Sequence, residues 1–181
     1  MSSPDGIGKV IFTEEQIQQQ IKQMADQINQ DYQGMELIII CILKGSLYFT
    51  ADLTRLLTIP LNVDFLSIGV SKEAGGNPGV VRITKDLDLS LTGRHVLLVE
   101  DVIGTGLTLG YICQHLESGK PASLKICTLL DNPAERLINM PIAYRGFLMP
   151  DVFVVGYGLD YQEKYRNLPY IAEFRPNNFH K

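Results

Sequence analysis

The residues best suited to do chemistry lie in the stretch VLLVEDVIGTGLTL, residues 96–109. An apolar run ends in two carboxylates, Glu100 and Asp101, and a short segment with Gly104 and Gly106 then opens a helix-like run. Backbone N–H groups at a helix start favour a phosphate, and glycine lets the backbone approach it closely. The carboxylates suit ribose hydroxyls, or a Mg²⁺ ion through water. The stretch therefore predicts a sugar-phosphate site.

The spacing of the loop residues excludes two common phosphate motifs. Gly104, Gly106 and Gly110 do not form the G-x-G-x-x-G pattern, and the P-loop with its lysine is absent. Thr105 and Thr108 instead add two hydroxyl donors. An ordinary strand-to-helix turn with a helix cap is the alternative interpretation. The paired acids directly after an unbroken apolar strand argue against that alternative.

Strand-like and helical segments alternate along the chain, which predicts an α/β fold with a mainly parallel twisted sheet flanked by helices. Strands are expected where short apolar runs occur, at 37–43, 61–69, 95–100, 123–130 and 152–156. Helices are expected to begin at Thr13, which forms a capping box with Gln16, to cover roughly 46–57, and to run from near Thr105 to about Ser118. The Gly-rich segment at 71–79 is expected to form a loop between two strands.

Composition narrows the class of protein. The chain has 181 residues, 45% of them hydrophobic, which fits one domain with a sizeable core. Its formal net charge of −4 disfavours a non-specific nucleic-acid binder, so no nucleic-acid partner is expected. Three cysteines without metal-ligand spacing, no leader-like N-terminal pattern and no apolar run long enough to cross a bilayer predict a cytoplasmic protein without a membrane partner.

The combination of motifs is similar to one known family. The stretch at 96–109 resembles the signature of type I phosphoribosyltransferases, in which two acids precede a Thr-Gly-x-Thr phosphate loop. CILKGS at 41–46 resembles the first loop of the hypoxanthine-guanine branch, and FVVGYGLDYQEKYRNLPYI at 153–171 resembles its C-terminal hood. The resemblance covers roughly 13–174.

The resemblance implies a single phosphoribosyltransferase domain over residues 1–181. Its core is expected at about 13–130 and 150–158, and its hood at about 131–149 and 159–181. The implied activity is transfer of a 5-phosphoribosyl group from phosphoribosyl pyrophosphate to N9 of hypoxanthine or guanine, with Mg²⁺ as cofactor. Relatives form oligomers, so a homodimer or homotetramer is expected.

Carried over residue by residue, the resemblance places the first loop on pyrophosphate, the acids on the ribose diol and the Thr-Gly-x-Thr loop on the 5′-phosphate. It implies that the following residues bind donor or base: Leu43, Lys44, Gly45, Glu100, Asp101, Val102, Ile103, Gly104, Thr105, Gly106, Leu107, Thr108, Asn132, Phe153, Val154, Asp160 and Arg166. The catalytic subset is Glu100, Asp101, Lys44 and Arg166, and the Mg²⁺-linked acids are Glu100, Asp101 and Asp160.

On the purine side, the resemblance implies that Phe153 stacks on the base and that the backbone of Val154 reads its edge. It also implies an unusual conformation for the peptide before Lys44. Simpler interpretations exist for these residues. Phe153 is otherwise a core aromatic on a strand, Lys44 a solvated surface lysine, and Asp160 with Arg166 a surface ion pair.

This sequence departs from the family at three positions that concern the base and the lid. The family has Asp where Gly104 stands, as the group that takes or holds the proton of the base, and Lys where Asn132 stands, as a donor to the 6-oxo group. Its lid carries Ser-Tyr where Val70 and Ser71 stand. Two further hypotheses follow: a diverged relative that binds the donor or a nucleotide as a regulator, and a transferase for a different base.

Overall fold

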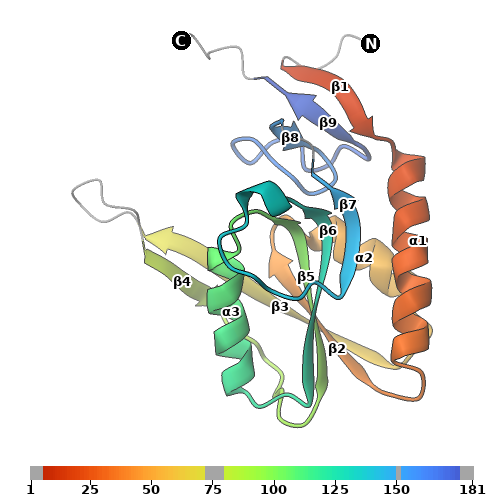
Figure 1. The fold of residues 1–181 in the computed structure, drawn as a ribbon, viewed down its shortest axis with the longest axis vertical. Helices are drawn as coiled ribbons and strands as arrows, with labels where there is room; N and C mark the ends of the chain where they lie inside the picture. The colour runs from red at the N-terminus through yellow and green to blue at the C-terminus, as the bar shows by residue number, and fades with distance from the viewer. Residues whose placement is uncertain (1–5, 72–79, 150–151, 176–181) are drawn as a thin grey trace.

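The computed structural model describes residues 6–71, 80–149 and 152–175 (Figure 1). Its main sheet has the strand order β4-β3-β2-β5-β6-β7, in which β4 is antiparallel to β3 and every other neighbouring pair is parallel. The strands are β2 (Leu37–Leu43), β3 (Leu61–Ser71), β4 (Val80–Lys85), β5 (His95–Ile103), β6 (Ser123–Asp131) and β7 (Tyr144–Leu148). This arrangement confirms the predicted α/β fold with a mainly parallel sheet.

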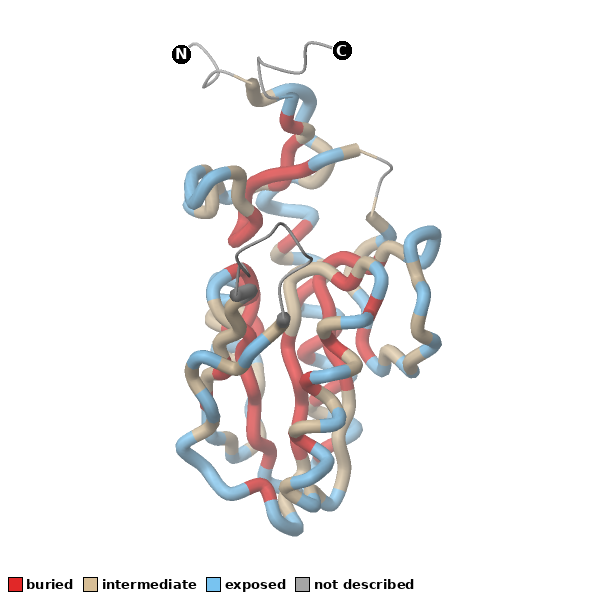
Figure 2. The backbone as a smooth tube through the Cα atoms, turned by 90° about the vertical axis from the view of Figure 1, so that its left-hand side faces the viewer, coloured by how far each residue is buried: buried red, intermediate tan, exposed pale blue. Residues whose placement is uncertain are grey.

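Helices cover both faces of the main sheet. Helices α1 (Glu14–Asp31) and α2 (Leu47–Leu56) share one core cluster with alternate residues of β2 and β5, such as Leu37 and Leu97. Helix α3 (Leu107–Ser118) shares the other cluster with the intervening residues, such as Ile38 and Val96. The strands are thus buried on both faces, as their continuous apolar sequence predicts. Figure 2 shows this buried spine running through the centre of the molecule.

The start of α1 agrees with its sequence signal. Thr13 is the N-cap, its side chain accepts a hydrogen bond from the Gln16 N–H, and the Gln16 side chain accepts one from the Thr13 N–H. The predicted apolar stripe is buried, each member at most 3% exposed: Ile17, Ile21, Met24, Ile28 and Tyr32. Helix α3 begins at Leu107 and ends at Ser118, as expected for a helix that follows the loop with Gly104 and Gly106.

A second sheet lies at one end of the molecule, beyond the carboxyl ends of β2, β5 and β6 (Figure 1). It contains β1 (Ile7–Phe12), β9 (Ile171–Phe174) and β8 (Val154–Val155), in the order β1-β9-β8. We call this sheet, with the loop between β8 and β9, the hood. The expected boundary differs from this arrangement in two places, since β7 extends the main sheet and β8 belongs to the hood. The first strand, β1, was not expected from the sequence at all.

The hood is joined to the main sheet by packing and by a long connection. The Phe12 ring at the end of β1 stacks on Phe147 of β7 with ring centroids 4.2 Å apart. Between β6 and β7 the chain forms a short 3-10 turn, η1 (Pro133–Glu135). The predicted lid at 71–79 lies, apart from Ser71, outside the described residues. No helix within the described ranges is long and apolar enough to span a bilayer.

Candidate active site

The predicted phosphate loop forms the turn between β5 and α3. Gly106 is the N-cap of α3 with φ +82°, in the left-handed region that favours glycine, and it has no side chain to cap the helix. Thr105 is exposed and Thr108 is partly buried, and Thr105 Oγ1 accepts a long hydrogen bond of 3.4 Å from the Leu107 N–H in the first turn. First-turn N–H groups have no partner within a helix, so this turn is suited to an anion.

A cavity of about 350 Å³ opens at this turn. The predicted residues that line it are Glu100, Val102, Ile103, Gly104, Thr105, Gly106 and Thr108. Leu107, the remaining predicted residue of the loop, is 54% exposed. The structure therefore gathers Glu100 and the phosphate loop around one cavity.

The two acids sit in an environment that disfavours negative charge. Burial and the neighbouring Asp101 charge raise the pKa of Glu100 well above its usual value, and Glu100 Oε2 is buried without a hydrogen-bond partner among the described residues. Burial also raises the pKa of Asp101, although the Val102 N–H donates to Asp101 Oδ1 at 2.8 Å and the Arg166 charge opposes the rise. Hydroxyl donors or a cation brought to these carboxylates would stabilise their ionised forms.

The loop after β2 brings the first predicted binding segment against Asp101. The peptide between Leu43 and Lys44 is cis. A Cβ on Gly45 would overlap the Asp101 carboxylate, so only glycine allows the loop to approach this closely. Ser46 is buried and donates a hydrogen bond to the Ile42 carbonyl oxygen, which ties the loop back to its own strand.

The hood packs against the loop after β2. Gly158 has φ +99°, and a Cβ there would overlap the Gly45 carbonyl oxygen, so the hood loop packs directly on the first loop. Arg166 donates to the Gly158 carbonyl at 2.8 Å and forms an ion pair with Asp160 at 2.7 Å. The charges of both Asp160 and Arg166 act on Asp101. These positions thus come together from distant parts of the chain.

Lys44 also meets the hood. Its ammonium group lies 2.8 Å from a carboxylate oxygen of Glu163, whose other oxygen lies 3.2 Å from Arg166. The hydrogen bond from Lys44 lowers the pKa of Glu163. Sequence reasoning missed Glu163, although it stands three residues from both Asp160 and Arg166 in the hood motif. This exposed carboxylate therefore pairs with both cations.

The residues expected to contact a purine come from the hood and from the end of β6, at the same end of the main sheet. Phe153 is 53% exposed and packs edge-on against Tyr161, with ring centroids 6.1 Å apart, so it is not a core aromatic. Val154 is buried in β8. The Asn132 N–H, directly after β6, donates to the Ile103 carbonyl at 2.9 Å, which brings Asn132 beside the phosphate loop.

A buried ion pair that the sequence did not suggest fastens this last segment. Asp131 is 1% exposed and pairs with Arg136, while Arg145 lies 2.6 Å from its other oxygen. Arg136 also donates to the Ile103 carbonyl at 3.2 Å. The strand ends of β5 and β6 are therefore held together through side chains of the β6–β7 connection.

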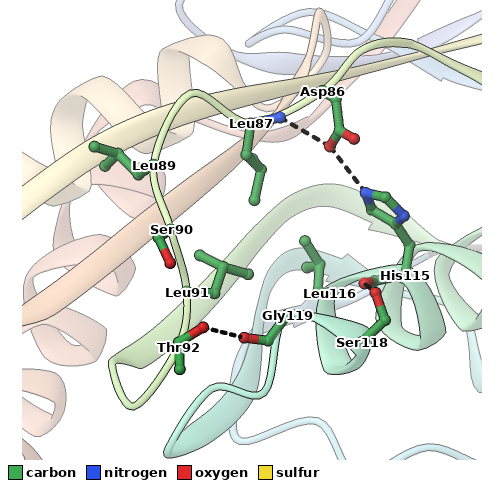
Figure 3. Close-up of a pocket in the computed structure, with 10 residues that line it drawn as sticks. All are labelled: Asp86, Leu87, Leu89, Ser90, Leu91, Thr92, His115, Leu116, Ser118 and Gly119. Carbon is green, nitrogen blue, oxygen red and sulfur yellow. Dashed lines mark hydrogen bonds and ion pairs between the residues drawn. The ribbon is translucent and has the colours of Figure 1, made fainter.

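A second cavity, of about 250 Å³, lies at the opposite end of α3, near its C-terminus (Figure 3). His115 Nε2 lies 2.8 Å from Asp86 Oδ1 across this cavity, and Thr92 donates to the Gly119 carbonyl. None of its lining residues is among those predicted from the sequence. These contacts fasten the loop before β5 to α3 and take no part in the site described above.

The acids at the end of β5 offer two carboxylates to a Mg²⁺ ion. No group of three or more His, Cys, Asp or Glu side chains in the described part of the chain is arranged to hold a metal alone. Mg²⁺ usually binds through one or two carboxylates, water and the phosphates of a substrate, so it does not require such a group. The unpartnered Glu100 Oε2 and the raised pKa of Asp101 fit an ion that arrives with its ligand.

Comparison with known proteins decides the family. Residues 9–162 match the model of the phosphoribosyl transferase domain. The chain belongs to the phosphoribosyl transferase family. The hypoxanthine-guanine phosphoribosyltransferase of Mycobacterium tuberculosis is 44% identical over 179 residues, covering 96% of this chain and 89% of that protein. The enzyme of the same name from Bacillus subtilis is 43% identical over 170 residues, covering 94% of each.

Solved structures agree with this assignment. A hypoxanthine phosphoribosyltransferase from Staphylococcus aureus superposes with a TM-score of 0.90 at 42% identity, covering 98% of this chain and 96% of that one. The fold described above is therefore that of type I phosphoribosyl transferases. Within this phosphoribosyl transferase, the turn at the end of β5 corresponds to the motif on which the sequence resemblance rested.

Proposed function

We propose that this phosphoribosyl transferase moves a 5-phosphoribosyl group from phosphoribosyl pyrophosphate to N9 of an oxopurine, hypoxanthine or guanine. The products are the nucleoside monophosphate and pyrophosphate. The observation that supports this most strongly is the convergence at one end of the sheet of four chemically distinct parts. These are the open helix start, the paired acids, the loop that carries Lys44 and the hood that carries Arg166.

The donor is held by groups suited to each of its parts. The 5′-phosphate accepts hydrogen bonds from the first-turn N–H groups of α3 and from the hydroxyls of Thr105 and Thr108. Glu100 and Asp101 accept hydrogen bonds from the ribose diol, which gives the buried Glu100 Oε2 the partner it lacks within the described chain. Gly45 leaves room for Asp101 to adopt this position.

The leaving pyrophosphate is stabilised by positive charge on the opposite side of the ribose. Lys44 and Arg166 are the cations that lie there, and both are currently paired with Glu163. When bound, Mg²⁺ supplies further neutralisation of the pyrophosphate as charge builds on it, with Glu100, Asp101 and Asp160 as its linked acids. Lys44 and Arg166 orient the pyrophosphate so that its departure from C1′ leaves that carbon open to the base.

The base is held between the hood and the β6–β7 connection. The exposed face of Phe153 offers a stacking surface, and Val154 presents its backbone beside it. Asn132 offers an amide donor to the 6-oxo group, weaker than the charged lysine of the family. Stacking on Phe153 and a neutral hydrogen bond from Asn132 then provide the affinity of side chains for the base.

The test is product formation from phosphoribosyl pyrophosphate and Mg²⁺ with hypoxanthine, guanine, xanthine and adenine in turn, followed by chromatography of the nucleotides. Turnover with hypoxanthine or guanine is expected, and no turnover with any base would overturn the proposal. Tight donor binding by calorimetry without turnover would instead favour a regulator. Turnover with another base alone would favour a transferase of different specificity.

We also propose that the chain acts as a homodimer or homotetramer in the cytoplasm. Helix α2 exposes three large apolar side chains, Leu47, Tyr48 and Leu56, each at least 39% exposed. Contiguous exposed apolar side chains commonly mark a subunit contact, and Leu47 and Tyr48 are adjacent in the chain. Light scattering coupled to size-exclusion chromatography tests the assembly, and a single mass near that of one chain would contradict it.

A further inference from the structure

An acidic side chain from the η1 turn reaches into the space beside Gly104. Glu135 Oε2 lies 3.1 Å from the point where a Cβ on Gly104 would stand. Its carboxylate forms no hydrogen bond or ion pair within the described residues. The adjacent Arg136 guanidinium is already engaged by Asp131 and by the Ile103 carbonyl, so it does not neutralise Glu135.

The main chain that carries Glu135 is held on both sides of η1. Before η1, the Asn132 N–H donates to the Ile103 carbonyl at 2.9 Å, and after it the Leu137 N–H donates to the Thr105 carbonyl at 3.0 Å. The segment that carries Glu135 is thus bound at both ends to residues on either side of Gly104. The approach of Glu135 to Gly104 follows from this attachment of the main chain.

The inference rests on the proposed function, because that reaction needs a proton acceptor near Gly104. An oxopurine that attacks through N9 carries its imidazole proton on N7. As the C1′–N9 bond forms and the C1′–O bond to pyrophosphate breaks, the purine becomes cationic unless that proton leaves. A glycine at position 104 has no side chain to accept it, and Asn132 is neutral.

We propose that Glu135 accepts the N7 proton of the purine and is the general base of this enzyme. The electron pair of the N7–H bond then returns to the ring as N9 bonds to C1′, and the pyrophosphate leaves with the electrons of the C1′–O bond. The proton ends on the Glu135 carboxylate and later passes to water. The carboxylate that the family carries on the loop is supplied here from the β6–β7 connection.

Gly104 and Glu135 are alternatives for the same space. A contact of 3.1 Å between a Cβ at position 104 and Glu135 Oε2 is tighter than ordinary van der Waals contact. An aspartate at position 104 would therefore press on Glu135 and set two negative charges together. We therefore expect that restoring the family's aspartate helps only after Glu135 has been shortened.

The experiment compares Glu135→Gln, Glu135→Ala, Gly104→Asp and the double variant Gly104→Asp/Glu135→Ala. Glu117→Gln is the matched control, since Glu117 is an exposed carboxylate of α3 outside the site. Glu135→Gln is expected to lower kcat by about 10²-fold or more and to abolish the acidic limb of its pH profile. The Kd for phosphoribosyl pyrophosphate with Mg²⁺, measured by calorimetry, is expected to stay unchanged.

The other variants give the sharper contrast. Gly104→Asp alone is expected to leave kcat no higher than in the wild type, whereas the double variant is expected to recover at least about 10-fold of the loss seen in Glu135→Ala. Glu117→Gln is expected to match the wild type. Unchanged donor affinity in each variant shows that the protein is folded, and Glu135→Asp with partial activity provides a second conservative check.

Three results overturn the inference, and they are distinguishable. An active wild type with an equally active Glu135→Gln and the same pH profile would sink the role of Glu135 and leave the proposed function standing. A wild type that turns over no base would sink both. Rescue by Gly104→Asp in the presence of Glu135 would show that the two carboxylates do not compete, and it would also contradict the inference.

Discussion

Glu100 illustrates how a single residue can serve function at the expense of stability. Burial and the adjacent Asp101 raise its pKa, so the ionised form is less favourable in the folded protein than in the unfolded chain. For a carboxylate with a raised folded pKa, the favourable state is the protonated one. The contribution of Glu100 to stability is therefore fully present below the ordinary pKa of a glutamate. It is lost as pH rises through the pKa of Glu100 in the folded protein.

This residue gives a prediction that separates stability from activity. Glu100→Gln is expected to raise the free energy of unfolding of the ligand-free protein by about 1–2 kcal/mol near pH 8, because it removes a buried charge without a partner. Near pH 4, about the ordinary pKa of a glutamate, the difference should vanish. Urea denaturation at both pH values measures it, and activity is expected to fall.

A stabilising effect that stayed equal at both pH values would contradict the electrostatic explanation. Glu117→Gln serves as the control, because Glu117 is exposed and its substitution should change stability little at either pH. Loss of stability in Glu100→Gln would show that Glu100 has a partner when ionised.

At the residue scale, the sequence predicted the shape of the turn at Gly106 better than the charged groups around it. The turn with Gly106 follows from local sequence alone, since a strand, two acids and a glycine-containing helix start are contiguous. Glu163 and Glu135 were not found, because each lies in a segment whose approach to the site depends on the fold. A carboxylate that meets a lysine or a glycine from a distant segment forms no motif of fixed spacing in the sequence.

At the scale of elements, contact between the hood loop and the loop after β2 decides the shape of the site. Gly158 lies in the left-handed region and directly against the Gly45 carbonyl oxygen. Gly158→Ala is expected to lower the free energy of unfolding by about 1–3 kcal/mol. It should also reduce kcat/KM for the donor by about 10²-fold, because a small shift of the hood displaces Arg166.

Gly34→Ala is the matched control for that prediction. Gly34 has φ +76°, but no atom lies within 4 Å of the place where an added methyl group would stand, so only the backbone conformation is penalised. Its substitution should cost about 1 kcal/mol and leave kcat/KM unchanged. Equal kinetic effects from the two substitutions would show that the contact with Gly45 is unimportant for the donor site. Denaturation and steady-state kinetics give both quantities.

Elements with strong local patterns were predicted well, and short elements were not. Helix α1 and strands β2 and β5 carry a capping box or long apolar runs, and all appear where expected. Strand β8 has two residues, and whether such a segment joins the main sheet or the hood depends on pairing with β9, which lies distant in the sequence. For this reason the sequence analysis placed β8 in the core although it pairs in the hood, and β7 in the hood although it pairs in the main sheet.

At the scale of the whole molecule, the site is assembled from four separate parts of the chain, so a bound donor should stabilise all of them together. At a concentration about 100-fold above its Kd, phosphoribosyl pyrophosphate with Mg²⁺ is expected to raise the free energy of unfolding by about 2.7 kcal/mol. For a chain of this length, that corresponds to a rise in Tm of roughly 5–10 °C.

Differential scanning calorimetry with and without the donor measures this shift. Ribose 5-phosphate reaches the turn at α3 but lacks the group that Lys44 and Arg166 contact, so at matched concentration its effect should be smaller. Equal stabilisation by the two ligands would contradict the part assigned to the pyrophosphate side. No stabilisation by either would remove the basis for the donor site.

The pairing of β1 with β9 has a consequence for how the protein is made. Ile7 lies opposite Phe174, so β1, which precedes the main sheet in the sequence, pairs with β9, which follows it. While translation continues, β1 presents an unpaired edge and an apolar side that have no partner yet. Every strand of the main sheet precedes β9 in the sequence, so β9 closes the hood only after the main sheet has been synthesised. A nascent chain therefore acquires the hood side of the purine site later than the phosphate loop.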